Sequence, residues 1–441
     1  MSTLKVNKLR DTAGSTDAIV LDPNGGAVLS GVTTISTARI TTGITTSIQV
    51  GGGVTISESG IEASGIGITC ANINGTQIGG RRNIIINGAM QVAQRGTSST
   101  SSGYHTIDRW QVNHSVQNAP TAAQAAVASG TTPYSLGFRK ALKVTNGDQS
   151  NGATASSIFY IRQMIESQDI AQSGWNYTSS SSFITLSFWI KSSVAQSFHG
   201  HLRTRDGTAQ RFLFQTGALS ANTWTKITKK IPGNSNLQFD TDTTTNAIDR
   251  GLDLSICPYM GTTYTDSGAT FDQWQASTDG NFAGTDMTTT WFTTNDATLE
   301  ITGVQLEVGS QATAFEHRSF GEELALCERY FYKIIGDMND HTGIMGYLTS
   351  AGESRNGLHL PVSMRTVPTY AGSGNAQIDS TPDTNDFSLS SNATLDGAYH
   401  TTNSPNSLML QCTHGGSAVG GHGGGIRFRS DGAFISLSAE L

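Results

Sequence analysis

The sequence predicts a mainly β protein, with a short docking segment, an interwound β stalk and two antiparallel β domains in tandem. Only 14% of its 441 residues are charged, whereas globular enzymes carry about 25%. Its 50 glycines stand among many small polar and β-branched residues, a composition that favours sheets and tight turns. Its 17 Phe, 11 Tyr and 6 Trp suffice for packed cores and argue against intrinsic disorder.

Charge and hydropathy exclude several kinds of partner. The net charge is −7, and the sequence contains no cluster of Lys and Arg residues that could follow a phosphate backbone. We therefore expect no nucleic-acid partner. Because no run of about 18 apolar residues occurs, we expect no membrane-embedded segment. The N-terminus lacks the apolar core of a signal peptide.

The four cysteines are far apart and share no CxxC pattern, which predicts buried, inert thiols.

Residues 1–24 are expected to be a docking segment. Leu4, Val6 and Leu9 alternate with polar residues, and an apolar run follows at 19–21. Alternation with a period of two predicts a brief strand. Because so short a strand is not stable alone, we expect it to dock on another protein.

Residues 25–81 are rich in Gly and contain no aromatic residue. Single β-branched residues recur between Gly, Ser, Thr and Asn, too sparsely for one chain to form a core. Three copies wound about an axis would bring each Ile to its symmetry mates, so we predict a trimeric β stalk. A flexible Gly-rich linker is the alternative. The predicted stalk core consists of Ile35, Ile40, Ile44, Ile48, Ile56, Ile61, Ile66, Ile68 and Ile73.

Residues 82–317 contain all six tryptophans and are predicted to form an antiparallel β-sandwich or jelly roll. Strand-like runs occur at 83–87, 183–190, 212–214 and 299–306, separated by loops rich in Ser, Asn and Gly. Trp110 and Trp189 lie in strand patterns, so we expect both in the core.

A junction helix is predicted at 318–334. Ser319 and Glu322 have capping-box spacing, and Leu324, Cys327 and Phe331 would share one face. Strand-and-turn patterns return over 335–441, with an alternating final strand at 434–437. We expect these residues to form a distal, sandwich-like β domain.

Two phrases resemble the opening and the close of a domain common in phage tail-fibre and virion structural proteins. The opening is Arg82-Asn-Ile-Ile-Ile-Asn-Gly-Ala-Met-Gln-Val-Ala-Gln-Arg-Gly96 with Tyr104-His-Thr-Ile-Asp-Arg-Trp110. The close is Thr302-Gly-Val-Gln-Leu-Glu-Val-Gly-Ser310 with Phe315-Glu316 and the segment 319–330. The stretch 360–369 resembles what often follows in such fibres, and the head resembles fibre-like proteins of marine phages.

This resemblance implies a jelly-roll domain shaped like carbohydrate-binding modules, trimeric assembly, and attachment to the virion through the N-terminus. We therefore expect a non-catalytic homotrimeric tail fibre, made in the host cytoplasm and carried on the virion. Its partners would be tail or other virion proteins and a host surface glycan or outer-membrane receptor. The alternatives are a structural connector or capsid decoration, and a polysaccharide-degrading fibre.

The sequence contains no familiar catalytic motif. Two carboxylates suffice to cleave a glycosidic bond, and the loop around Trp274 offers Asp272, Asp279 and Asp286. Solvated loop carboxylates or a structural calcium site are alternative interpretations of these residues.

His199 and His201 flank one glycine in a predicted strand, so both side chains point the same way. Three copies on an axis would present six imidazoles to a transition metal. The alternative, which we favour, is a surface strand with two solvated histidines. We expect no cofactor.

The receptor contact is placed in the distal domain, because loops of such scaffolds carry function. The candidate residues are Tyr399, His400, His414 and His422 in turn-rich segments. The glycine run at 420–425 is also compatible with a simple tight turn.

Overall fold

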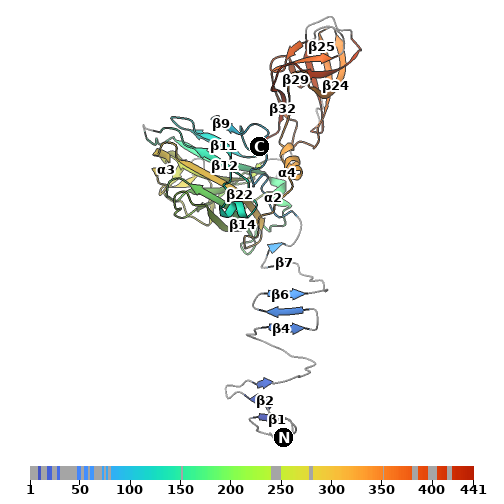
Figure 1. Cartoon of the computed structure of the whole chain (residues 1–441). Coiled ribbons are helices and arrows are strands. Elements are labelled where there is room, and N and C mark those ends of the chain that lie inside the picture. The colour runs from blue at the N-terminus through green and yellow to red at the C-terminus, as the bar shows by residue number, and fades with distance from the viewer. Residues whose placement is uncertain are drawn as a thin grey trace. The chain divides into compact units, whose positions relative to one another are not determined.

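The structure is a computed structural model (Figure 1). By their internal contacts the residues form two compact units, 1–70 and 71–441, each described by itself. The described residues are 8–10, 17–21, 27–29, 47–50, 54–57, 60–63, 72–73, 76–77, 81–149, 152–239, 250–277, 282–350, 352–379, 386–395, 405–414 and 420–441.

The first unit contains two small antiparallel sheets. One consists of β1 (Lys8–Arg10), β2 (Asp17–Leu21) and β3 (Ala27–Leu29); the other of β4 (Ser47–Val50), β5 (Val54–Ser57) and β6 (Gly60–Ala63). The second unit begins with β7 (Asn72–Ile73) and β8 (Thr76–Gln77).

The residues of the predicted docking segment and stalk are only partly described. Leu9, Ile48, Ile56, Ile61 and Ile73 lie in strands. Residues outside the described part are Leu4, Val6, Ile35, Ile40, Ile44, Ile66 and Ile68. The strands pair within one chain, and trimeric winding stays a prediction.

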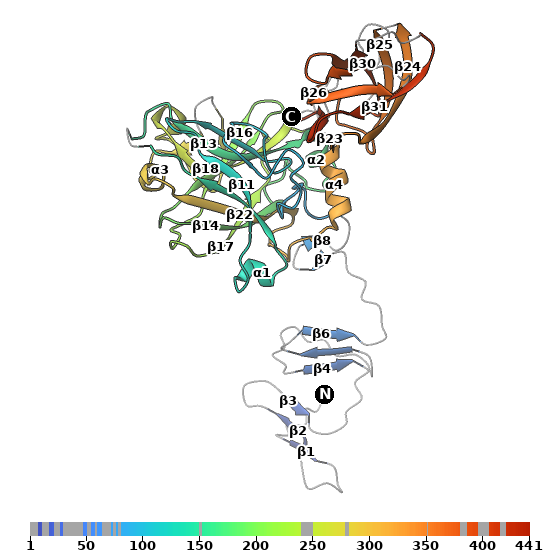
Figure 2. The same ribbon diagram turned by 45° about the horizontal axis from the view of Figure 1, so that its top comes forward.

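Two six-stranded antiparallel sheets form a sandwich in the second unit (Figures 1 and 2). The first sheet has the order β10 (Gln111–Ser115), β13 (Ile158–Glu166), β18 (Arg250–Met260), β15 (His199–Thr204), β16 (Gln210–Gln215) and β20 (Trp274–Ala276). The second has the order β17 (Thr225–Pro232), β14 (Phe183–Ser192), β22 (Thr298–Val308), β12 (Lys140–Thr145), β11 (Thr121–Ala126) and β9 (Ser98–Ser99).

The connections between these sheets follow jelly-roll topology. Strands β13, β18, β15 and β16 are adjacent in the first sheet, and β12, β22, β14 and β17 in the second. Successive strands from β12 to β15 therefore alternate between the sheets, and the last strand, β22, returns beside the first, β12. This is the order of a double Greek key, in agreement with the predicted fold class.

Period-two alternation builds the sandwich core. In β14 the buried apolar side chains are Ile184, Leu186, Phe188 and Ile190, which belong to one hydrophobic cluster with residues of both sheets. Trp110 is fully buried in this cluster, as predicted. The prediction for Trp189 was wrong: it is half-buried and packs with a separate cluster outside the core.

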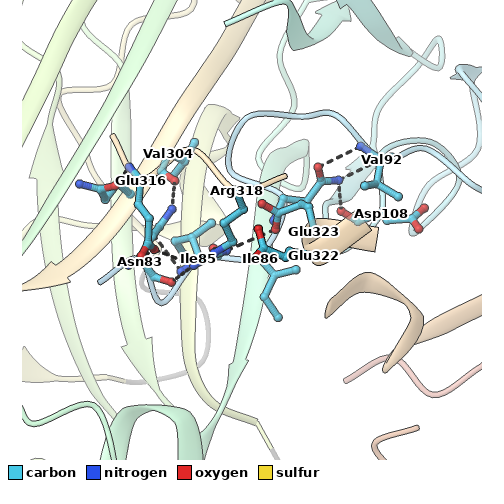
Figure 3. Close-up of polar contacts among 12 residues, drawn as sticks. Asn83, Ile85, Ile86, Val92, Asp108, Val304, Glu316, Arg318, Glu322 and Glu323 are labelled. Atoms are coloured by element: carbon cyan, nitrogen blue, oxygen red, sulfur yellow. Dashed lines mark hydrogen bonds and ion pairs between the residues drawn. The ribbon is translucent and has the colours of Figure 1, made fainter. Parts of the chain in front are cut away.

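The run at 83–87 was predicted to be a strand, and it is not one. Side chains, rather than a neighbouring strand, occupy most of its backbone groups (Figure 3). The side-chain oxygen of Asn83 accepts from the backbone N–H groups of Ile85 and Leu306, each at 3.0 Å, and its side-chain nitrogen donates to the Val304 carbonyl. Gln163 bonds both the N–H and the C=O of Ile86.

The closing phrase of the domain completes this polar network (Figure 3). The Glu316 carboxylate accepts from the backbone N–H groups of Arg82 and Asn83 at 3.1 and 2.8 Å. Arg318 donates to the carbonyls of Asn83 and Ile85 and pairs with Glu316. The two ends of the jelly roll are thereby bonded directly to each other.

The predicted junction helix is present but shorter. Helix α4 spans Phe320–Glu328 and has the predicted capping box between Ser319 and Glu322. The helix does not extend to Phe331 and Lys333 as predicted, because the segment Phe331–Gly336 is strand β23 and pairs with β32. Its aromatic and β-branched residues favour that pairing.

Short elements complete the sandwich. They are α1 (Thr132–Ser135), α2 (Ser167–Ala171), η1 (Thr262–Tyr264), β19 (Thr265–Asp266), β21 (Ala283–Gly284) and α3 (Thr290–Thr293).

The C-terminal residues form a nearly closed barrel around their own core. A three-stranded sheet has the order β23, β32 (Ala433–Ser438) and β26 (Thr369–Ser373). A seven-stranded sheet has the order β28 (Asp386–Ser388), β27 (Asn375–Asp379), β31 (Gly423–Phe428), β24 (His341–Ser350), β25 (Glu353–His359), β30 (Ser407–Thr413) and β29 (Ala393–Leu395). The edge strands β26 and β29 lie against each other.

Charged groups join the sandwich to the C-terminal barrel. Arg109, 1% exposed, pairs with Glu440 and stacks on the Tyr330 ring, 3.4 Å from its centroid. The Glu166 carboxylate accepts hydrogen bonds from the Arg329 guanidinium at 2.8 Å and from the Tyr330 hydroxyl at 2.5 Å. Because Arg109, Glu440 and Glu166 are buried and paired, removal of a partner would leave a costly unpaired charge.

We predict that Asn83→Ala destabilises the fold by about 3 kcal/mol or more, because one buried carbonyl and two buried N–H groups lose their partner. Chemical denaturation measures this free energy. Asn295→Ala, at an exposed position, is the control and should change it by less than about 0.5 kcal/mol. Equal stability of both variants would contradict the assigned role of Asn83.

Burial raises the pKa of Asp108 to about 6, although Arg95 and Gln94 favour the charged form. The folded chain therefore binds this proton more tightly than the unfolded chain. The stability that Asp108 contributes is present below about pH 4 and is lost as the pH rises through about 6.

We predict that the wild-type chain loses about 2 kcal/mol of unfolding free energy relative to Asp108→Asn between about pH 4 and pH 7. Denaturant titrations of both proteins across this range measure the difference. A difference that does not vary with pH would contradict the raised pKa.

Candidate functional site

A hollow of about 360 Å³ lies on the outer face of the second sheet, the face turned away from the sandwich core. Ser187 and Trp189 of β14 and Lys226 of β17 line it, with Lys226 directly opposite Trp189 in the strand register. We call it the aromatic hollow; its other lining residues are Leu136, Phe138, Gly303, Ala312, Thr313, Ala314, Phe315 and His317.

Three rings form one side of the aromatic hollow. The Phe138 ring is 4.9 Å from Phe315 and 5.1 Å from His317, and Phe315 and His317 are 4.9 Å apart. A ring nitrogen of His317 lies 2.9 Å from the Leu136 carbonyl. These contacts fix the rings, so the hollow is preformed rather than dependent on rearrangement.

The loop at 309–317 is held over the sheet by two residues of the closing phrase. The buried Glu307 carboxylate accepts from the N–H and the hydroxyl of Thr313 at 2.8 and 2.6 Å. Gln305 accepts from the N–H of Glu316 at 2.8 Å. Phe315 therefore projects from a loop fixed at both ends.

Gly303 makes room for the Phe138 ring. Its φ is +62°, in the left-handed region, where non-glycine residues are uncommon. A Cβ at this position would lie 2.6 Å from the Phe138 ring. A glycine is thus required where β22 passes the hollow.

Chemically, the aromatic hollow combines apolar ring surface with polar groups at its edge. The ring faces of Trp189 and Phe315 can stack on a sugar ring. Lys226, His317 and Ser187 supply polar groups for sugar hydroxyl groups. Such a mixture is typical of small-molecule and saccharide sites.

This site was not predicted from the sequence, because Trp189 was expected in the core. The signal was present in the run itself: Trp189 has the same period-two phase as Thr185 and Ser187, opposite to the buried Ile184, Leu186, Phe188 and Ile190.

Of the candidate receptor residues of the distal domain, the structure describes His414 and His422. His414 is buried at the end of β30, and His422 is exposed in the turn before β31. Tyr399 and His400 lie outside the described residues.

The two strand histidines are buried, so the interpretation as solvated surface residues was wrong. His199 is 1% and His201 4% exposed, because the segment after β18 covers them. His201 stacks on Phe282, and His199 packs against Phe271. Burial lowers the pKa of His201 to about 4, so its ring is neutral at pH 7.

Two of the three candidate carboxylates are described, and both have a partner in the sandwich. Asp272 pairs with Lys229 at 3.0 Å, and Asp286 accepts from Gln215 at 2.6 Å. Asp279 lies outside the described residues. In the part of the chain that the structure describes, no group of three His, Cys, Asp or Glu side chains could hold a metal ion. No described helix is long and apolar enough to cross a membrane.

The described thiols agree with the sequence analysis. Cys257, Cys327 and Cys412 are free and buried, and burial raises the pKa of the Cys412 thiol to about 12. Such thiols are protonated and unreactive at neutral pH.

No protein-family model matches the chain. No curated protein matches it. Among solved structures, the enzymatically active domain of bacteriophage CBA120 tailspike protein 4 is 10% identical, with a TM-score of 0.27; the match covers 51% of this chain and 21% of that one.

Two carbohydrate-binding modules give similar values. A family-4 module is 12% identical, with a TM-score of 0.26, and the match covers 50% of this chain and 97% of that one. The family-11 module of Clostridium thermocellum is 11% identical, with a TM-score of 0.22, covering 50% and 98%. TM-scores this low do not establish a shared fold.

The architecture of the second unit defines the class of protein. The second unit is a mainly β assembly, in which an antiparallel jelly-roll sandwich is followed by a nearly closed barrel. The sandwich presents a preformed aromatic hollow on its outer face.

Proposed function

We propose that this chain is a non-catalytic, homotrimeric phage tail fibre that is attached to the virion by its N-terminus and binds a glycan on the host surface. The aromatic hollow of the jelly-roll domain is the observation that supports the proposed glycan binding. The virion part is supported by the opening and closing phrases of that domain, which resemble those of phage fibre proteins.

The geometry of the hollow favours a saccharide over a fully apolar ligand. Trp189 is half-buried and Lys226 is exposed beside it, so ring surface and a charged donor face the same space. Ser187 adds a hydroxyl group at the edge. Saccharides need both kinds of contact, because their rings stack while their hydroxyl groups require hydrogen-bond partners.

Trimeric assembly would make a weak site effective. A single shallow hollow binds a sugar weakly, but linked copies engage a repeating surface polymer together. Multivalent attachment then raises the overall affinity by about 10²–10⁴ over one site. A fibre can therefore bind a host surface without a deep pocket.

We predict that Trp189→Ala weakens binding to an array of bacterial surface polysaccharides by about ten-fold, because the stacking surface is lost. Tyr347→Ala, which removes a 48% exposed ring from the C-terminal barrel, is the control and should bind as the wild type does. Thermal unfolding checks that both variants are folded. Loss with Tyr347→Ala but not with Trp189→Ala would place the contact in the distal domain instead.

We predict that light scattering gives the intact chain three times the 46.6 kDa of one copy, and that a fragment beginning at Arg82 gives one copy. The physical reason is that residues 25–81 have too few apolar residues for a core of their own. A monomeric intact chain would leave 25–81 as a linker and remove the trimer from the proposal.

A further inference from the structure

A cluster of arginines surrounds one buried carboxylate on the outer face of the first sheet. Asp253 of β18 has a side chain that is only 1% exposed. Arg205 contacts it through Nε at 2.7 Å, Arg250 through Nε at 3.4 Å and Arg162 through Nη1 at 3.8 Å. We call these three residues with Asp253 the arginine cluster.

The strand register places the arginine cluster beside other polar side chains. Arg162 of β13 lies opposite Gln111 on one side and Ser255 on the other. The Ser255 hydroxyl is buried, and among the described residues it has no hydrogen-bond partner. Arg162 also lies over the Tyr160 ring, 4.8 Å from its centroid, so a ring and an unsatisfied hydroxyl adjoin the guanidinium groups.

Positive charge exceeds negative charge in the arginine cluster. Among the described residues, three guanidinium groups share one carboxylate. Burial lowers the pKa of Arg250; Asp253 opposes this effect, while Arg205 and Arg162 reinforce it. Like charges held this close are stabilised by a further anion.

Guanidinium donors remain for such an anion. Arg205 reaches Asp253 through Nε alone, and a guanidinium carries five N–H donors, so within the described part of the chain its two Nη groups are left for another acceptor. The arginine side chains stay 13% to 30% exposed, and a ligand can reach them. The planar fork of arginine matches carboxylate and similar oxyanions in a bidentate geometry.

We propose that the arginine cluster is a second saccharide subsite, which binds the anionic group of an acidic polysaccharide, either a carboxylate or a sulfate ester. This inference rests on the proposed glycan-binding function and adds the charge of the glycan. The Tyr160 ring, which adjoins Arg162, would stack on the sugar ring.

Binding of polygalacturonate, dextran sulfate and neutral dextran to the intact chain tests this proposal, measured by calorimetry at fixed salt. The wild type is expected to bind one acidic polymer more tightly than dextran; polygalacturonate indicates a carboxylate and dextran sulfate a sulfate ester. Arg205→Gln with Arg250→Gln should weaken that binding about ten-fold or more.

Two further variants serve as a control for charge and as a substitute in case the first variant does not fold. Arg429→Gln removes the same charge from the C-terminal barrel, where Arg429 is 33% exposed, and should leave acidic binding unchanged. Should the Gln pair prove unfolded, Arg205→Lys with Arg250→Lys keeps the charge around Asp253 but removes the planar fork, and should still bind more weakly than the wild type.

Unchanged acidic binding in the folded Arg205/Arg250 variants, or an equal loss in Arg429→Gln, would overturn the proposal, the latter because it indicates non-specific attraction. A wild type that binds neutral polysaccharides through Trp189 but prefers no acidic polymer would overturn this inference alone. A wild type that binds no polysaccharide would overturn the proposed glycan binding as well.

Discussion

A buried polar network, in which side chains satisfy the backbone of residues 83–87, closes the jelly roll. Asn83 links this segment to β22, and Glu316 and Arg318 return from the other end of the domain to bond it. Each buried group left without a partner would cost about 1–3 kcal/mol. The sandwich, the junction with α4 and the loop over the hollow all depend on this closure.

The backbone around the network is held in uncommon conformations. Asn87, Met90 and Arg109 all have positive φ, which costs of order 1 kcal/mol or more for such residues. The Asn87 side chain donates to the carbonyls of Val92 and Asp108 and accepts from the N–H group of Val92. Arg109 is fixed by Glu440 and Tyr330. The contacts of Arg109 also join the two β domains.

Different residues stabilise the jelly-roll domain and contact the proposed ligand. Within the opening and closing phrases, Asn83, Gln305, Glu307 and Glu316 bond backbone groups of their own domain. Of the proposed contacts with ligand, Trp189 and Lys226 lie outside those phrases, and Phe315 belongs to the closing phrase. A scaffold of this kind can keep its closure while its exposed faces change.

The sequence predicted much of the fold because local patterns decide it. Alternation in 183–190 and 299–306 gave β14 and β22, and the Ser319–Glu322 spacing gave the start of α4. The failures share a cause, since each depended on partners distant in the chain. Residues 83–87 are bonded by Gln163, Glu316 and Arg318, and β23 is drawn into a sheet by β32.

The candidate site was less predictable than the fold. The aromatic hollow joins Phe138, Trp189 and Phe315 from three separate segments, and only the phase of Trp189 within β14 was visible locally. The arginine cluster needed the strand register, because Arg162, Arg205 and Asp253 are far apart in sequence. His199 and His201 were correctly placed on one face, but their burial depends on Phe271 and Phe282, which lie in a covering segment far along the chain.

Native-state hydrogen exchange tests the closure of the jelly roll most directly. The amides of Ile85, Asn87 and Leu306 donate to side chains of the network. If the network is integral to the fold, all three should exchange only through the same global opening as core amides of β14. Rapid exchange of Ile85 and Asn87 while the β14 amides stay protected would contradict the account, because the segment would then be a detachable arm.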